Sequence, residues 1–380
     1  MTSGAHHGRS LGADPSSDYA RFVRWLLAAV AIAVVALLAA LWWLDPTSVT
    51  GRTTRFSVVA NGGVRQAKLD LMERLPAPPD VLILGSSRSM QLDPADVTDL
   101  TGGTAFNGAV SGGTSKDMYL YARYAEQLWG DDYPHLVLGV VTDVLRPSGT
   151  AGLDPRLKRF LPRDQQDRDA LEVADELLRV QTLDAAQRAL RHVVPRDGAG
   201  SLLDPTGGTE NVDAGLATTG RQKNNRLDLL EPDGMTARVT DDQDTGTLQQ
   251  RIDRQMQEYL ANSFAQGDTF TGTSTSGVYY LRRTIQIANS HGDVPVLWVT
   301  PFNPAARTRL PAAYAERDAA FRDAIRTLQG DDDLKFTFVS ATDDLASFGG
   351  VPADFHDGIH MMPANTRRVL EYLQREGLLE

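Results

Sequence analysis

The chain has 380 residues, of which 42% are hydrophobic, which is enough for one large or two ordinary domains with a buried core. Its formal net charge is −11 at pH 7 and Lys and Arg form no cluster, which argues against a nucleic-acid partner, because binding phosphates requires grouped cations. Cysteine is absent, which excludes disulfides, thiolate metal sites and a cysteine nucleophile.

An uninterrupted apolar segment lies near the N-terminus, at residues 25–44. As a helix its 20 residues are about 30 Å long, the thickness of the hydrocarbon core of a bilayer. Trp25 lies at one end and Trp42 and Trp43 at the other, where indole rings prefer the lipid–water interface. A cleaved signal peptide is the alternative, but its apolar region is normally about 7–15 residues long. We therefore expect an uncleaved transmembrane anchor that binds the bilayer through residues 25–44.

The charges that flank this segment predict its orientation. Arg21 and Arg24 precede it and Asp45 follows it, so the positive-inside tendency places the N-terminus in the cytoplasm. Arg52 and Arg55, on the far side, oppose this orientation. We expect a single-pass protein of the cell membrane with four parts: a disordered cytoplasmic tail (1–18), the anchor (19–45), a juxtamembrane linker (46–75) and an extracytoplasmic domain (76–380).

Short apolar runs alternate with helical periods in the extracytoplasmic part, which is typical of an α/β fold with a parallel sheet and crossover helices. The apolar spacing of the helices places hydrophobic side chains on one face of each. The predicted strands are 81–85, 104–107, 136–141, 294–300 and 335–339, and the predicted helices are 115–128, 278–290, 314–329 and 364–375.

The alternation fails between about residues 148 and 275, which we interpret as a mainly helical and loop insertion into the α/β domain. Helical patterns at 168–192 and 247–264 flank a polar stretch at 197–246, and a lid, a partner-docking surface and a simple loop all remain open. The three aspartates within residues 241–244 do not have the spacing of a calcium-binding loop. We expect no metal and no cofactor.

Polar motifs follow the predicted strands, at the carboxyl ends where open parallel sheets bind ligands. Residues 85–89 follow the first strand, 111–114 the second, 142–143 the third and 301–303 the fourth, and the sequence Asp-Gly-Ile-His occupies 357–360. A single crevice at one edge of the sheet is therefore expected to collect these motifs.

Three of the collected side chains are those of a serine hydrolase. Ser87 is a poor nucleophile unless a base takes its proton and a carboxylate orients that base, and His360 and Asp357 have these roles in the prediction. The glycine turn at Gly112 allows backbone N–H groups to approach an oxyanion. A simple helix cap at the serine and a tight turn at the glycine are the alternatives. His356 is a second candidate base, without an aspartate three residues before it.

These motifs resemble the SGNH hydrolase superfamily, also called the GDSL-type esterases, over about residues 80–145 and 294–375. The resemblance implies a flavodoxin-like sheet with helices on both faces. It also implies a nucleophile at Ser87 in Gly85-Ser86-Ser87, a catalytic pair at Asp357 and His360, and an oxyanion hole formed by Ser87, Gly112 and Thr142.

Two positions depart from the family pattern. Ser86 replaces the usual aspartate and Thr142 replaces the usual asparagine of the third block. Membrane-anchored members with Gly-Ser-Ser resemble accessory proteins of acyl transfer to cell-wall polymers, which implies a membrane-bound acyltransferase as a partner. Arg88, Asp143 and Asn303 are candidate residues of the substrate pocket, although Asp143 is also a candidate cap and Arg88 a candidate surface ion pair.

The sequence leads to one main functional hypothesis and two alternatives. The main hypothesis is an extracytoplasmic serine esterase or O-acyltransferase acting on acyl groups of cell-envelope glycans or lipids. The first alternative is a catalytically weak or inactive scaffold of the same fold in envelope-polymer assembly. The second, a dinucleotide-binding enzyme, lacks both the Gly-x-Gly-x-x-Gly and the Gly-Lys-Ser/Thr phosphate-binding motifs.

Overall fold

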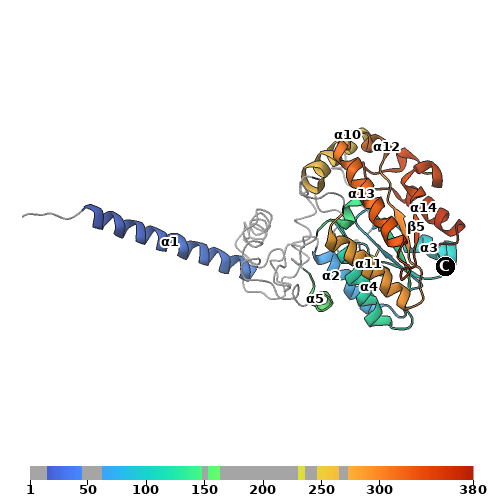
Figure 1. Ribbon diagram of the computed structural model, residues 1–380, viewed down its shortest axis with the longest axis horizontal. Coiled ribbons are helices and arrows are strands. Elements are labelled where there is room, and N and C mark those ends of the chain that lie inside the picture. The colour runs from blue at the N-terminus through green and yellow to red at the C-terminus, as the bar shows by residue number, and fades with distance from the viewer. Residues whose placement is uncertain are drawn as a thin grey trace, which may run out of the picture.

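The computed structural model of the protein describes residues 15–44, 62–147, 153–162, 230–235, 246–264 and 273–379 (Figure 1). A five-stranded parallel sheet with the strand order β2-β1-β3-β4-β5 forms the centre of the domain. This is the flavodoxin-like order of doubly wound sheets, and it confirms the predicted α/β class. The strands are β1 (Val81–Leu84), β2 (Ala105–Asn107), β3 (His135–Val140), β4 (Val296–Val299) and β5 (Thr337–Val339).

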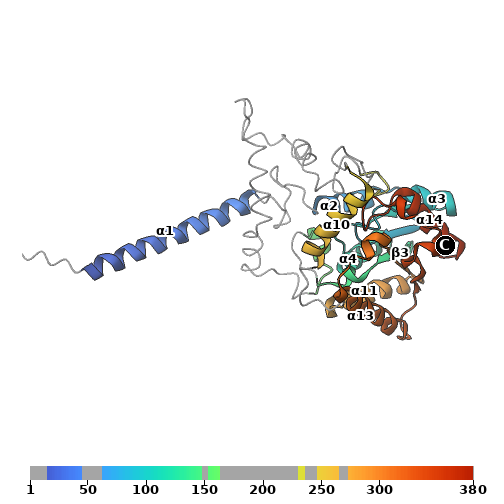
Figure 2. The ribbon, with the colours of Figure 1, turned by 90° about the horizontal axis from the view of Figure 1, so that it is seen from above.

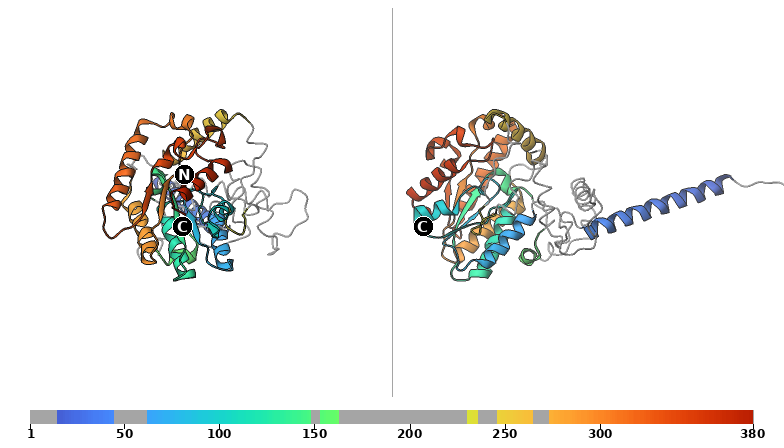
Figure 3. Two further views of the ribbon diagram at one scale, coloured as in Figure 1. Left: turned by 90° about the vertical axis from the view of Figure 1, so that its right-hand side faces the viewer. Right: turned by 180° about the vertical axis from the view of Figure 1, so that it is seen from behind.

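Helices cover both faces of the sheet, as Figures 2 and 3 show. Strand β1 illustrates the result: all four of its residues are buried, with Leu82 and Leu84 in the core on one face and Val81 and Ile83 in the core on the other. Burial on both faces explains why this strand has a continuous apolar run instead of an alternating pattern. The predicted helices correspond to α4 (Ser115–Trp129), α11 (Thr275–Ser290), α13 (Ala312–Gln329) and α14 (Pro363–Arg375).

Shorter elements complete the described part of the chain. The helix that follows the serine motif is capped at its start by Asp93, whose Oδ1 accepts a hydrogen bond from Ala95 N, and at its end by Gly102, with a φ of 77°. These elements are α3 (Pro94–Thr101), α5 (Pro155–Lys158), α10 (Leu248–Glu258), a π-helix (Tyr259–Phe264), α12 (Pro304–Arg307) and the 3₁₀ turns Thr142–Leu145, Ala341–Asp343, Leu345–Phe348 and Pro352–Asp354.

The N-terminal helix α1 (Pro15–Leu44) contains a segment, Arg21–Trp43, that is long and apolar enough to cross a membrane. A signal sequence meets the same criteria of length and composition. The helix starts at Pro15, inside the expected tail, and residues 1–14 lie outside the described residues. The helical pattern expected at 168–192 also lies outside them, whereas the one at 247–264 corresponds to α10 and the π-helix.

Helix α2 (Gly62–Arg74) lies in the segment that we expected to be a linker. Its Leu69 and Met72 are fully buried in the same core as Leu82 and Leu84 of β1. Val64 is buried as well, so the packed part of the domain begins at least 12 residues before the expected boundary at residue 76, since 76 − 64 = 12. The helix is hard to predict because its four-residue repeat of apolar side chains is interrupted by charged residues.

One of these charged residues, Lys68, is completely buried and fixes α2 to the carboxyl end of β2. Its Nζ donates to the carbonyl oxygens of Asn107 and Ala109, at 2.8 and 2.6 Å. Burial lowers the pKa of Lys68 to about 7, although the negative charge of Asp233 opposes this shift. The amine therefore loses its proton near neutral pH in the folded protein.

We expect Lys68→Met to remove a pH dependence of stability. The unfolded lysine keeps its proton up to about pH 10.4, so between about pH 7 and 10 the unfolded chain binds more protons than the folded one. The free energy of unfolding of the wild type should then rise by up to about 1.4 kcal/mol per pH unit across this window. Urea unfolding at several pH values measures it. The exposed Lys335→Met is the matched control, and equal pH slopes in the wild type and Lys68→Met would contradict the prediction.

Candidate active site

Ser87, His360 and Asp357 form a hydrogen-bonded series, although 273 residues separate the serine from the histidine. Ser87 Oγ lies 3.0 Å from His360 Nε2, and His360 Nδ1 lies 2.8 Å from Asp357 Oδ2. The histidine and the aspartate are buried and the serine is partly exposed. The structure thus brings together the three residues predicted to carry the chemistry, and His356 does not take the position next to Ser87.

The loop that carries the histidine is closed on itself. Residues Phe355 and Met361 form an antiparallel bridge, and His356 N donates to His360 O at 2.9 Å. Asp357 Oδ1 accepts the backbone N–H groups of Ile359 and His360, at 2.8 and 2.9 Å, while Oδ2 faces the imidazole. A carboxylate only accepts, so this network assigns the proton to Nδ1 and leaves Nε2 as an acceptor for the serine hydroxyl.

Two neighbours hold this loop from outside. Asn303 N donates to Gly358 O at 3.0 Å, and Arg251 Nε donates to His356 O at 2.6 Å. Both polar groups of the Asn303 side chain are hydrogen-bonded within the protein, because its Oδ1 accepts from Ala305 N and its Nδ2 donates to Pro352 O. With 2% of its surface exposed, Asn303 has a structural role in place of the substrate contact that we expected.

The glycine turn after β2 lies against the serine turn after β1. Val110 N donates to Gly85 O at 3.1 Å, and a Cβ on Gly113 would overlap the same carbonyl oxygen, so this contact requires a glycine. Gly112 is exposed, with a φ of 63°. Within the described ranges, the backbone N–H groups of Ser87 and Gly112 donate no hydrogen bond. Two backbone donors without a partner are what an oxyanion hole requires.

Thr142 does not have the place that we predicted for it. It begins the 3₁₀ turn after β3, its side chain is fully buried, and its hydroxyl makes no hydrogen bond of acceptable geometry within the described residues. A side chain enclosed in this way does not contact a substrate oxygen. The expected third oxyanion donor is therefore not exposed in this arrangement.

Arg88 and Asp143 come together, as part of a largely buried cluster. Arg88 is 4% exposed, its guanidinium lies 4.1 Å from the ring centre of Phe302, and its Nη2 lies 3.6 Å from Asp143 Oδ2. Tyr259 donates its hydroxyl to the same carboxylate oxygen at 2.8 Å. Burial and the adjacent negative charge raise the pKa of Tyr259 well above its usual value, which keeps it a hydrogen-bond donor.

Sequence reasoning missed Tyr259 and Arg251, which both come from the insertion. The signal was present in the spacing of Ile252, Met256 and Tyr259, which places one buried face on the helical segment 247–264. Such a face predicts that the segment packs against the domain, but it does not identify the residues that the segment contacts. The described part of the insertion is thus in direct contact with both the histidine loop and the Arg88 cluster.

We expect Tyr259→Phe to lower the free energy of unfolding by about 1.5–3 kcal/mol, because the Asp143 carboxylate loses a partly buried hydrogen bond. In a double-mutant cycle with Asp143→Asn, the two effects should be strongly non-additive. The exposed Tyr279→Phe is the matched control and should change stability by less than about 0.5 kcal/mol. Additive effects of Tyr259→Phe and Asp143→Asn, measured by urea unfolding, would contradict the coupling.

No group of three or more His, Asp or Glu side chains arranged to hold a metal ion occurs within the described residues. Comparison of the sequence with protein-family models and with curated proteins finds no match.

Proposed function

We propose that this protein is a membrane-anchored, extracytoplasmic SGNH-like serine esterase or O-acyltransferase that acts on acyl groups of cell-envelope glycans or lipids. The observation that carries the proposal is the series Ser87–His360–Asp357, with distances of 3.0 and 2.8 Å. The unused N–H groups of Ser87 and Gly112 support it, and the apolar helix α1 supports a position at the membrane.

The proposed reaction proceeds in two halves. Ser87 Oγ attacks the ester carbonyl carbon while its proton passes to His360 Nε2, and Asp357 stabilises the imidazolium that forms. The N–H groups of Ser87 and Gly112 stabilise the oxyanion. The alcohol then leaves with the proton from His360, and an acyl group remains on Ser87. Water or a sugar hydroxyl, deprotonated by His360, takes the acyl group and restores the serine. A membrane-bound acyltransferase is the partner that we propose for the transfer reaction.

We expect Ser87→Ala to abolish hydrolysis of short-chain aryl esters and covalent labelling by a fluorophosphonate probe. Asp357→Asn should lower kcat by about 10⁴-fold, because the amide favours the wrong imidazole tautomer. Ser290→Ala, at the distant end of α11, is the matched control and should retain both signals. A wild-type protein that neither hydrolyses the esters nor reacts with the probe would overturn the proposal.

The burial of Thr142 favours a second candidate, a scaffold of envelope-polymer assembly that has lost efficient chemistry. A missing oxyanion donor costs about 3–4 kcal/mol of transition-state stabilisation in serine hydrolases. The two candidates differ in a complementation experiment. We expect Ser87→Ala to fail to rescue a deletion strain although the protein is present at normal abundance, whereas full rescue would favour the scaffold.

A further inference from the structure

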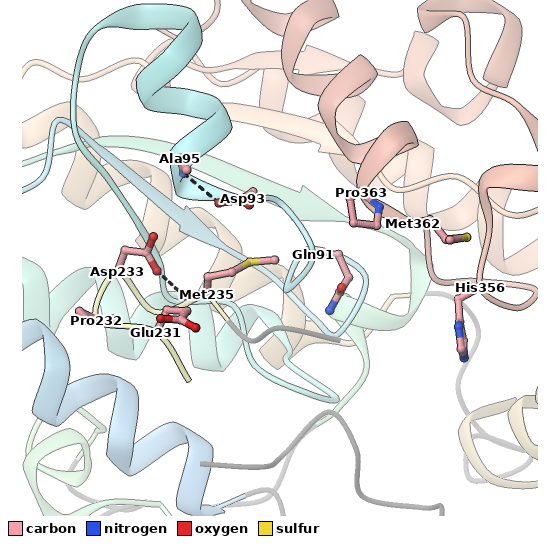
Figure 4. Close-up of a pocket in the computed structure, with 10 residues that line it drawn as sticks. All are labelled: Gln91, Asp93, Ala95, Glu231, Pro232, Asp233, Met235, His356, Met362 and Pro363. Atoms are coloured by element: carbon pink, nitrogen blue, oxygen red, sulfur yellow. Dashed lines mark hydrogen bonds between the residues drawn. The ribbon is translucent and has the colours of Figure 1, made fainter. Parts of the chain in front are cut away.

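A cavity of about 610 Å³ lies between the start of α3, the turn at residues 230–235 and the loop that carries His360 (Figure 4). Ligand sites in proteins typically have volumes of about 300–1,000 Å³. We propose that this cavity binds a neutral, hydroxyl-rich ligand, namely a glycan segment that forms the alcohol part of the ester. This inference rests on the proposed function and assigns the substrate class to its site.

The cavity shares its walls with the two loops of the candidate active site. Gln91 lies four residues after Ser87, and His356 and Met362 lie on either side of His360 in the sequence. Figure 4 shows the side chains of Gln91 and His356 beside the open space. A ligand in the cavity therefore contacts both loops that carry the reacting groups.

The opposite wall is packed against the sheet. Asn107 N donates to Asp233 O at 2.8 Å, and a Cβ on Gly234 would overlap Asn107 O, so the turn at 230–235 is packed tightly on the end of β2. Glu231 N also donates to Met235 O at 2.8 Å, which closes the turn. This piece of the insertion is thus held in place as a wall before any ligand binds.

Gln91 points to a ligand independently of the cavity volume. Only 2% of its surface is exposed, and its side-chain amide makes no hydrogen bond in the described part of the chain. A side-chain amide that has no partner in the protein offers both a donor and an acceptor to a ligand. A ligand hydroxyl, which also donates and accepts, satisfies both groups of this amide.

The charges of the cavity disfavour an anionic ligand. Asp93, Glu231 and Asp233 all lie in its lining. One oxygen of Asp93 accepts from Ala95 N and one of Asp233 accepts from Met235 N, both at 2.9 Å, which leaves the second oxygen of each carboxylate as an acceptor. Hydroxyl groups supply the matching donors, whereas phosphate or carboxylate groups would be repelled.

Calorimetric titration of the full-length Ser87→Ala protein in detergent tests the proposal without turnover. The probes are cellotetraose and tetra-N-acetylchitotetraose, which are neutral, the deacetylated tetramer, which is cationic, and a phosphorylated maltotetraose, which is anionic. We expect millimolar or tighter binding of at least one neutral probe and at least tenfold weaker binding of the anionic one. A second substitution, Gln91→Leu, should weaken the neutral binding at least tenfold, whereas the exposed Gln249→Leu should leave it unchanged.

Three results would overturn the proposal: no binding of either neutral probe, no effect of Gln91→Leu in a protein with an unchanged unfolding transition, or binding of the cationic tetramer more than tenfold tighter than both neutral probes. The last result would assign the cavity to an amine. Ester hydrolysis and probe labelling of the wild type report on the proposed function separately. Hydrolysis without glycan binding removes the cavity assignment alone. Glycan binding without labelling removes the proposed function and, with it, the assignment of the glycan as the alcohol part of an ester, and leaves only a glycan-binding cavity.

Discussion

The candidate site depends on the hydrogen bonds that the carboxylate of Asp357 accepts. One oxygen accepts two backbone N–H groups and so fixes the shape of the loop, while the other accepts the imidazole proton and so fixes the direction of His360. A single side chain thereby couples the fold of the loop to the protonation of the base. The arrangement works only because Ser87 and His360 both lie at the carboxyl edge of the parallel sheet, where their loops meet.

The sequence predicted those features that depend on local pattern. Apolar runs bounded by Gly, Asp and Ser gave the five strands within two residues, and a spacing of three between Asp357 and His360 was sufficient for a self-closing loop. The meeting of Ser87 with His360 did not follow from strand ends alone, because residues 357–360 do not directly follow a strand. It was expected from the roles that Ser, His and Asp have together in serine hydrolases. The helix that is long and apolar enough to cross a membrane was also predicted, from length and composition alone.

The features that sequence did not predict depend on where side chains point after packing. Asn303 and Thr142 both follow strands at the correct edge, yet one caps α12 and the other is enclosed. Lys68 carries a charge that normally indicates a solvent-exposed side chain. The carbonyl groups at the end of β2 compensate its burial by accepting its hydrogen bonds. Tyr259 lies in the insertion, and the periodicity of that segment does not identify Asp143 as its contact.

Because α2 already belongs to the packed domain, the distance between the candidate site and the bilayer is limited. Only 17 residues, 45–61, separate the end of α1 at Leu44 from α2, and a fully extended chain of this length reaches at most about 60 Å. On the proposed topology, Ser87 therefore stays within the reach of this tether above the membrane surface. Acyl esters held within this distance of the membrane would meet Ser87 at a high effective concentration, whereas soluble esters would gain nothing from the tether.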